Sequence, residues 1–260
     1  MWYNYSVILL KYDEREIFVQ QQKDEMIIAG RNSVNEALKG DREIECLLAV
    51  KGAQGPVGAI IAKAKEKKIP IRYIPKQKLD ERVNGVNHQG VALVMCAANY
   101  SDIDDIVSDG DSSLVIILDK IEDPHNLGAI IRTADAAGAH GVIIPKRGGA
   151  GLSSTVAKVA CGACEHVKVA RVPNISAAID KLKSCGYWIY GADMDGENCF
   201  NTRLSGKVGL VIGSEGFGIS RIVKEKCDFI VSIPMCGEIN SLNASVAAGI
   251  LMYKAVADRD

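Results

Sequence analysis

The stretch LVIILDKIEDPHNLGAIIR, residues 114–132, decides the fold class. It begins with five consecutive apolar residues, Leu114 to Leu118, as is typical of a strand buried on both faces. A polar turn that contains Pro124 follows, and apolar residues then recur at helical spacing. An apolar strand followed directly by an amphipathic helix predicts an α/β fold with a parallel sheet.

The same alternation continues to the end of the chain. Further strands are expected at 141–144, 167–169, 188–190, 208–212 and 229–233, and further helices near 154–164, 175–185, 219–227 and 244–257. We therefore expect residues 114–260 to form a parallel sheet flanked by helices. Because ligands bind such sheets beyond the carboxyl ends of the strands, the loops after Leu118, Ile212 and Ile233 are the expected site.

A smaller α/β unit is expected upstream, over residues 26–98. Its predicted helices lie near 33–39, 57–68 and 78–83, and its predicted strands at 44–50, 71–74 and 90–95. Residues 99–113 are acidic and turn-rich, which indicates a linker. Residues 1–25 are expected to be an extension whose role the sequence does not indicate, and Met26 is a candidate for the ancestral start.

Charge is distributed unevenly along the chain. Residues 26–98 hold 12 Lys or Arg against 7 Asp or Glu, a net charge of +5, whereas residues 99–260 hold 16 against 20, a net charge of −4. A basic front unit on a slightly acidic body fits a module that binds RNA phosphates. The clustered lysines of residues 63–68 also fit an ordinary solvated helix face, and the charge alone leaves both interpretations open.

Composition excludes some classes of protein. The chain is 48% hydrophobic, but its longest nearly apolar stretch, Ala244 to Tyr253, is shorter than the roughly 18 residues that a membrane span needs. The first residues do not resemble a secretory signal, so we expect a cytoplasmic protein without a membrane partner. Its eight cysteines are then expected to be reduced and buried. Cys161 and Cys164 have CxxC spacing within an expected helix, but no second pair follows, so no metal is expected.

The first candidate loop contains Asn126 and Arg132. Pro124 disfavours helix at the preceding residue, so the helix should begin near His125 or Asn126 with an Asx cap. Asn126 is therefore either that cap or a site residue. Asn126 and Arg132 are six positions apart, about 240° of helical rotation, so they do not share one face of the helix.

The other two loops are rich in glycine and in hydrogen-bonding side chains. The second, GSEGFGIS at 213–220, lets a ligand approach the backbone closely and carries a lone carboxylate, Glu215. The third, 233–245, holds Asn240, Ser241, Asn243 and Ser245, which is more than one helix cap requires. Each loop alone is weak support for a site.

In this order, the three loops resemble the motifs of the SpoU-type, or TrmH-like, branch of the SPOUT RNA methyltransferases. The matching segments are Asn126 with Arg132, GSEG at 213–216, and IP at 233–234 with SLNAS at 241–245. GRNSVNEAL at 30–38 and HQGV at 88–91 resemble the substrate-binding domain that precedes the catalytic domain in this family. The chain departs from the pattern in residues 1–25, which have no counterpart, and in Ala244, where valine is commoner.

The resemblance implies a fold, a reaction and a cofactor. It implies a C-terminal trefoil knot in the parallel sheet, a small α/β RNA-binding domain in front of it, and a homodimer. It implies methylation of a ribose 2′-hydroxyl, with S-adenosylmethionine bound through backbone groups at Gly213, Ile233 and Leu242. The RlmB type, which methylates a guanosine of large-subunit (23S) ribosomal RNA, is the most similar pattern.

By the same resemblance the catalytic residues are Asn126, Arg132, Glu215, Ser241 and Asn243. Asn126 would orient Arg132 or the ribose, Glu215 would pair with Arg132 or Asn126, and Ser241 and Asn243 would shape the cofactor loop. The family assigns the arginine as general base, but a guanidinium is hard to deprotonate. Arg132 therefore either takes the hydroxyl proton in a dry site or binds a flanking phosphate while water takes the proton.

Other functions remain open on the sequence. The substrate could be another ribosomal RNA or a tRNA, and the protein could be a non-catalytic RNA-binding assembly factor. A nucleotide-dependent α/β enzyme is disfavoured, because the strand at 114–118 lacks a glycine-rich turn with an acidic residue about 20 positions later.

Overall fold

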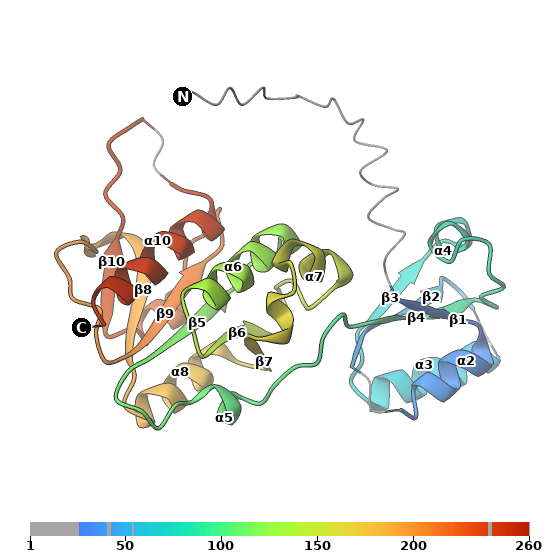
Figure 1. Ribbon diagram of the computed structural model, residues 1–260. Coiled ribbons are helices and arrows are strands. Elements are labelled where there is room, and N and C mark those ends of the chain that lie inside the picture. The colour runs from blue at the N-terminus through green and yellow to red at the C-terminus, as the bar shows by residue number, and fades with distance from the viewer. Residues whose placement is uncertain (1–25, 41–42, 54, 239–240, 260) are drawn as a thin grey trace, which may run out of the picture.

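The computed structural model describes residues 26–40, 43–53, 55–238 and 241–259. The extension expected over residues 1–25 lies outside the described residues. Figure 1 shows a small N-terminal unit and a larger C-terminal unit that are joined by an extended segment. The small unit contains β1 to β4, and the large unit contains β5 to β10.

The small unit is a four-stranded mixed sheet with helices on both faces. Its strand order is β1-β4-β2-β3, in which β2 and β3 are parallel and the other neighbours are antiparallel. Successive residues of β2, such as Leu47 and Leu48, point to opposite faces and join separate apolar clusters. The strands are β1 (Ile27–Ala29), β2 (Ile44–Val50), β3 (Ile71–Ile74) and β4 (Val91–Met95), and the helices are α2 (Arg31–Ala37), α3 (Pro56–Glu66) and α4 (Lys76–Arg82).

The large unit has a six-stranded sheet in which every neighbouring pair is parallel. The strand order is β10-β8-β9-β5-β6-β7, so the strand that decides the fold class, β5, lies near the centre. The strands are β5 (Ser113–Asp119), β6 (Gly141–Pro145), β7 (Lys168–Val172), β8 (Trp188–Asn198), β9 (Lys207–Gly213) and β10 (Phe229–Ser232).

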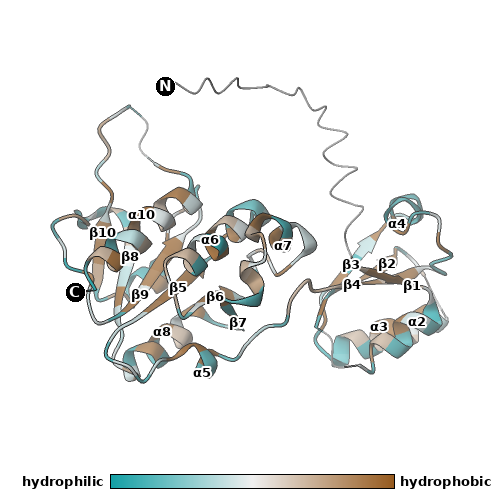
Figure 2. Cartoon of the chain, viewed as in Figure 1, coloured by the Kyte–Doolittle hydropathy of each residue, from teal (hydrophilic) through white to brown (hydrophobic). Residues whose placement is uncertain are grey.

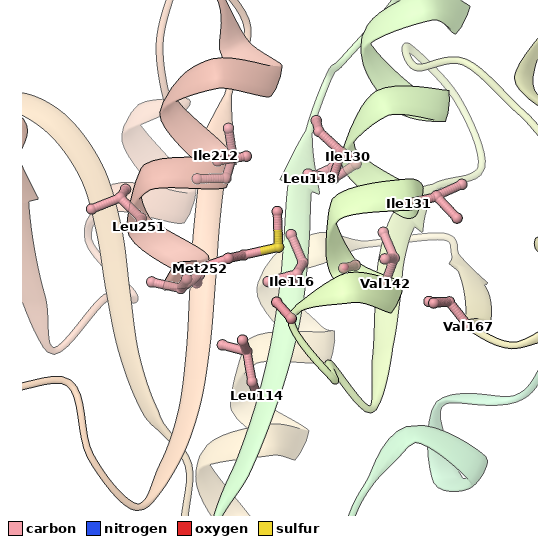
Figure 3. Packing of buried hydrophobic residues seen from close by; sticks show 14 of the residues in the cluster. Leu114, Ile116, Leu118, Ile130, Ile131, Val142, Val167, Ile212, Leu251 and Met252 are labelled. Carbon is pink, nitrogen blue, oxygen red and sulfur yellow. The ribbon is translucent and has the colours of Figure 1, made fainter. Parts of the chain in front are cut away.

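Helices cover both faces of this sheet, as the uninterrupted apolar strands predict. One face packs against α6 (Pro124–Ala136), α7 (Ser154–Ala160) and α10 (Ala244–Ala257). The other face packs against α5 (Ile103–Ile106), α8 (Ile175–Ser184) and α9 (Arg221–Lys224). Figure 2 shows hydrophobic residues along much of β6 and β9, and Figure 3 shows Met252 of α10 packed beside Ile116 of β5.

Close packing of α6 against α7 depends on Gly128. A methyl group at this position would lie 2.7 Å from Cβ of Val159 and 2.9 Å from the carbonyl oxygen of Val156. Since real side chains do not tolerate such distances, α7 can lie this close only because residue 128 has no side chain. This contact fixes α6, whose first turn carries Asn126.

Several local predictions are wrong in extent. The helix expected to reach Cys164 ends at Ala160, because Cys161 adopts a left-handed conformation and a 3₁₀ turn (Ala163–Glu165) follows. The helix expected over 219–227 is the single turn α9. Strand β1 was not predicted, and β8 continues well beyond the expected residues 188–190.

The segment expected to be a linker is partly structured. It contains α5, whose N-terminus is a capping box formed by Asp102 and Asp105. The four-part division of the chain and the trefoil knot stay predictions.

The cysteines are only partly buried, contrary to expectation. Cys46, Cys96 and Cys199 are buried, but Cys161 and Cys236 are exposed, and no disulfide forms among the described residues. Burial raises the pKa of Cys96 and of Cys227 to about 12, so these two thiols stay protonated at neutral pH.

Candidate functional site

The three predicted loops begin at the carboxyl ends of three parallel strands. β5 and β9 are neighbours, and their last residues, Asp119 and Gly213, are paired in register. β10 lies beyond β8 at the same edge of the sheet. Side chains from all three loops therefore meet at this edge, as expected for a parallel sheet.

Asn126 is not the cap of its helix. The N-cap of α6 is Asp123, whose side chain accepts a hydrogen bond of 2.8 Å from the backbone nitrogen of His125. The capping interpretation of Asn126 is thus wrong. Its side chain lies in the first turn of the helix, is buried, and is available for contacts with the other loops.

Asn126, Glu215 and Asn243 form one hydrogen-bonded cluster. The Asn126 amide donates to Oε1 of Glu215 at 3.0 Å, and the Asn243 amide donates to Oδ1 of Asn126 at 2.9 Å. The Asn243 amide also lies 2.5 Å from the same oxygen of Glu215, and the backbone nitrogen of Ala244 donates to it at 3.3 Å. One carboxylate therefore joins all three loops, and hydrogen bonds to an ionised acceptor are among the stronger ones.

Asn243 also caps the last helix. Its Oδ1 accepts hydrogen bonds from the backbone nitrogens of Ser245 and Val246, at 3.0 and 3.4 Å, and from the Ser245 hydroxyl at 2.6 Å. The oxygen of this side chain thus starts α10 while its nitrogen holds the cluster. The capping and the site interpretations of this loop are both correct.

The second loop is a tight reversal. Ser214 and Gly218 exchange two backbone hydrogen bonds, of 3.1 and 2.8 Å, and Gly218 has a positive φ of 63°. A methyl group on Gly213 would lie 2.0 Å from the carbonyl carbon of Gly218, whereas one on Gly216 would meet nothing within 4 Å. Glycine is required at the base of this loop by the loop itself, and the tip is open.

Asp119 is a residue of this site that the sequence analysis missed. It is the last residue of β5, is only 4% exposed, and accepts a 2.7 Å hydrogen bond from the backbone nitrogen of Ser220. A buried carboxylate at a strand end therefore holds the far side of the second loop. An acidic residue directly after an apolar run was the signal that could have found it.

An ion pair on α9 also ties the second loop to the sheet. Lys224 lies 3.1 Å from Asp193 and 3.6 Å from Asp195, both on β8. The hydrogen bond to Asp193 raises the pKa of Lys224. The segment that follows the loop is thus anchored to β8 by charge as well as by packing.

Arg132 is not part of the cluster in this structure. Its side chain is exposed, and its guanidinium donates to the sulfur of Cys161 at 3.5 Å. Among the described residues no hydrogen bond or ion pair joins Arg132 to Asn126 or Glu215. The expected pairing of Glu215 is therefore made with Asn126.

The remaining predicted site residues belong to the third loop. Ser241 is exposed, whereas Ile233 and Leu242 are half-buried. Asn240 lies outside the described residues. The third loop thus offers two apolar side chains and a hydroxyl beside the cluster.

The loops leave backbone groups open for a ligand. Within the described residues, the backbone nitrogens of Glu215, Gly216 and Phe217 donate no hydrogen bond. A Cβ on Gly216 or Gly237 would meet nothing within 4 Å, so both loops have exposed backbone. Free amides next to half-buried apolar side chains fit a flat heterocycle with polar edges.

The described part of the chain contains no candidate metal-binding site. No three His, Cys, Asp or Glu side chains gather there in a group that could hold a metal ion. None of the described helices is long and apolar enough to cross a membrane.

Two family models match the sequence. The model of the SpoU rRNA Methylase family matches residues 113–253, and that of RNA 2'-O ribose methyltransferase substrate binding matches residues 27–101. YacO of Bacillus subtilis, which is assigned to the TrmH family of tRNA/rRNA methyltransferases, is 46% identical over 248 residues, 93% of this chain and 98% of YacO. A protein of Staphylococcus haemolyticus assigned to the same family is 45% identical over 242 residues, 91% of this chain and 97% of its own length.

Solved structures share the fold. The SpoU methyltransferase AviRb from Streptomyces viridochromogenes, in complex with AdoMet, has a TM-score of 0.59 at 24% identity, and the match covers 92% of this chain and 97% of AviRb. The AdoMet-bound rRNA methyltransferase from Sinorhizobium meliloti also has a TM-score of 0.59, at 23% identity, over 94% of this chain and 95% of its own. The fold described above is thus shared with these two structures.

Proposed function

Because the chain belongs to the SpoU rRNA methylase family, we propose that it transfers a methyl group from S-adenosylmethionine to a ribose 2′-hydroxyl in RNA. The observation that carries the proposal is the cluster of Asn126, Glu215 and Asn243, which ties three loops together at the carboxyl edge of the sheet. The relative and the solved structures that resemble this chain support the same reaction class.

Backbone groups of the second and third loops would hold the cofactor. The proposed contacts are Gly213, Ile233 and Leu242, and the open amides at Glu215 and Gly216 fit the polar edges of an adenosine. When bound, S-adenosylmethionine supplies a methyl group on a positively charged sulfur. No metal is proposed.

The described residues would act mainly by positioning. Asn126 uses its amide and its oxygen within the cluster, so we assign it and Glu215 to holding the loops in register. Ser241 and Asn243 would shape the third loop at the target ribose. Alignment of the reacting oxygen with the methyl carbon can lower the activation barrier by about 7–11 kcal/mol. A cluster that holds the loops rigidly would therefore contribute to catalysis.

Arg132 would contact the substrate RNA. Its exposed guanidinium has no carboxylate partner among the described residues, so it is free to bind an anion. S-adenosylmethionine would supply the methyl carbon to the ribose oxygen, and its sulfur would keep the electron pair of the broken carbon–sulfur bond. The hydroxyl proton would leave to water, or to Arg132 in the version in which this guanidinium has first lost its own proton. We favour the phosphate-binding version, because a solvated guanidinium keeps its proton.

The finer target remains a proposal. We propose a guanosine of 23S ribosomal RNA, on the resemblance to the RlmB type, and hence a protein of the cytoplasm. Another ribosomal RNA or a tRNA is the alternative, since YacO is assigned to a family of tRNA/rRNA methyltransferases. A non-catalytic RNA-binding factor would keep binding to S-adenosylmethionine and RNA without transfer.

The direct test is transfer of a labelled methyl group in vitro. The purified protein, radiolabelled S-adenosylmethionine and ribosomal RNA are incubated, and the RNA is digested to nucleosides. We expect label in a 2′-O-methylated nucleoside. Binding of both ligands without transfer would support the assembly factor instead, and label on a base would contradict the reaction.

Removing the Glu215 carboxylate is expected to impair turnover more than binding. Glu215→Ala leaves the buried Asn126 amide without its acceptor, a cost of about 1–3 kcal/mol. A displacement of the loops by about 1 Å can lower the rate about 100-fold. We therefore expect kcat to fall about 100-fold, KM for RNA to change little, and the Tm to fall by a few degrees. Steady-state kinetics and calorimetry measure both.

A matched variant, Glu215→Gln, separates the effect of losing the hydrogen-bond acceptor at residue 215 from the effect of losing its negative charge. Glu215→Gln keeps an oxygen at the same reach and should retain more activity than Glu215→Ala. Equal activity of the wild type and Glu215→Ala would show that the cluster does not organise the site.

The exposed face of α10 is expected to form the homodimer contact. Val246 and Tyr253 are 49% and 51% exposed in a helix of mostly apolar residues, and they lie seven residues apart on one face. We expect the wild type to be a dimer in light scattering and Tyr253→Asp to be a monomer. Tyr73→Asp is the control, because Tyr73 is 53% exposed and belongs to β3 of the small unit, whereas α10 belongs to the large unit in Figure 1. A monomeric wild type would contradict the expectation.

A further inference from the structure

A large open cleft with many charged side chains lies between the two units. It has a volume of about 1420 Å³ and is lined on one side by the end of α3, the segment after it and β3, and on the other by β7 and the loops after β6 and β7. Small-molecule pockets usually measure about 300–1,000 Å³ and are mostly apolar. The cleft is larger than that, and its lining is charged, which suits a polymer rather than a small molecule.

Positive charge lines both walls of the cleft. The wall of the small unit carries Lys65, Lys67, Lys68 and Arg72, and that of the large unit carries Lys146, Arg147 and Arg171. The cleft also contains three carboxylates, Glu43, Glu45 and Asp102. Seven cationic groups against three anionic ones give the cleft a net positive charge.

Part of the negative charge is already engaged. Glu45 lies 4.0 Å from Arg72, and Asp102 belongs to the capping box of α5. In the described part of the chain, Lys146 and Arg147 are exposed and form no ion pair. These two side chains are therefore available to a phosphate.

Arg171 is held in place before any ligand binds. Its guanidinium lies over the ring of Tyr100, 5.3 Å from the centroid, and donates to the carbonyl oxygen of Lys146 at 3.2 Å. The Tyr100 hydroxyl in turn accepts a 2.8 Å hydrogen bond from the backbone nitrogen of Leu152. A guanidinium fixed by stacking loses little freedom when it binds an anion.

The connecting segment fixes the floor of the cleft. The backbone nitrogen of Ala97 donates to Leu152 at 2.8 Å, and that of Ser101 donates to Val169 at 2.9 Å. The chain that leaves β4 is thus attached at once to the large unit. Residues of both units, among them Lys65 and Lys146, therefore line the same cleft.

The cleft adjoins the candidate site. The loop after β6 begins at the same edge of the sheet as the loop after β5, because the two strands are parallel neighbours. The backbone nitrogen of Ala150 donates to Ile121 at 2.7 Å, so the two loops are in direct contact. A strand that occupied the cleft would therefore continue toward Asn126 and Arg132.

We propose that this cleft binds a single-stranded RNA segment by its phosphates and leads it to the site. Lys146, Arg147 and Arg171 contact the phosphates next to the target nucleotide. Lys65, Lys67 and Lys68, at the end of α3 and just after it, contact phosphates further along the strand. The proposal rests on the proposed function for the identity of the polymer. It assigns the basic charge of residues 63–68 to one wall of a shared cleft rather than to an independent RNA-binding face.

The salt dependence of RNA binding tests the proposal. The probe is fluorescein-labelled oligouridylate, and anisotropy gives its Kd at a series of KCl concentrations. For single-stranded RNA, the slope of log K against log salt changes by about 0.7 for each phosphate contact that is lost. We expect Lys146→Gln with Arg147→Gln, and separately Lys67→Gln with Lys68→Gln, to reduce the slope by one to two such steps.

A double variant outside the cleft is the control. Lys76→Gln with Lys78→Gln removes the same charge from α4, whose residues do not line the cleft. Its slope should equal that of the wild type. Unchanged slopes in both cleft variants, or an equal loss in the control, would overturn the proposal.

Two further readouts separate this inference from the proposed function. Calorimetry should find the same Kd for S-adenosylmethionine in the wild type and in all charge variants, because none of the replaced residues lies in the second or third loop. If the wild type methylates RNA but both cleft variants keep the wild-type salt dependence of RNA binding, only the proposal that the cleft binds RNA is refuted. Changed slopes in a protein that transfers no methyl group would refute the proposed function and leave the cleft as an RNA site.

Discussion

Gly213→Ala is expected to weaken binding of S-adenosylmethionine by about 10- to 100-fold. The added methyl group would lie 2.0 Å from the carbonyl carbon of Gly218 and 2.3 Å from the backbone nitrogen of Ile219. Backbone atoms cannot rotate away as a side chain does, so the whole loop must shift. Overpacking of this kind costs about 1–3 kcal/mol, and each 1.4 kcal/mol corresponds to about tenfold in affinity.

Gly216→Ala provides the matched control for this prediction. It makes the same chemical change three residues away, where an added methyl group meets nothing within 4 Å. Calorimetry should find a smaller change in Kd for Gly216→Ala than for Gly213→Ala, and circular dichroism should find both folded. Equal affinities of Gly213→Ala and the wild type would remove the second loop from the cofactor site.

Replacement of Arg132 is expected to have the second large effect. Loss of a charged hydrogen bond to a phosphate costs about 1.5–3 kcal/mol. We therefore expect Arg132→Ala to lower kcat/KM for RNA by about 10- to 100-fold. Since the guanidinium is exposed and contacts only the Cys161 sulfur among the described residues, nothing there assists its deprotonation.

Arg132→Lys separates the two possible roles of this residue. Lysine keeps the charge but loses the forked geometry, so a phosphate contact predicts weaker RNA binding with a matching loss of kcat/KM. Full RNA affinity with lost turnover would instead assign Arg132 as the general base. Cys161→Ala is the control, because it removes the thiol that Arg132 contacts and should leave the kinetics nearly unchanged.

The sequence predicted the position of the site better than its internal contacts. Five uninterrupted apolar residues at 114–118 were enough to predict a buried parallel strand, and the rule on strand ends then identified the loops. That Asn126, Glu215 and Asn243 share one network could not be predicted from spacing. The three residues lie up to 117 positions apart, and only the folded sheet brings them together.

Local rules failed where two of them competed. Asn126 and Asp123 are both good helix caps, and Pro124 at the first helical position decides for Asp123, which frees Asn126 for the site. Cys161 gives no sequence signal for a left-handed residue, so the end of α7 was placed too late. The cleft could not be predicted from the sequence either. Its two walls come from separate units, and only the contact of the connecting segment at Tyr100 with the large unit places them opposite each other.

The most direct test of the central claim is a map of ribose methylation in RNA from cells with and without this gene. The account predicts that a 2′-O-methyl group in RNA is lost without the gene, returns with the wild-type protein, and does not return to the wild-type level with Arg132→Ala. Its presence in 23S ribosomal RNA would also support the finer target. Identical maps in the two cell lines, together with no transfer in vitro, would contradict the claim that this protein is an RNA ribose methyltransferase.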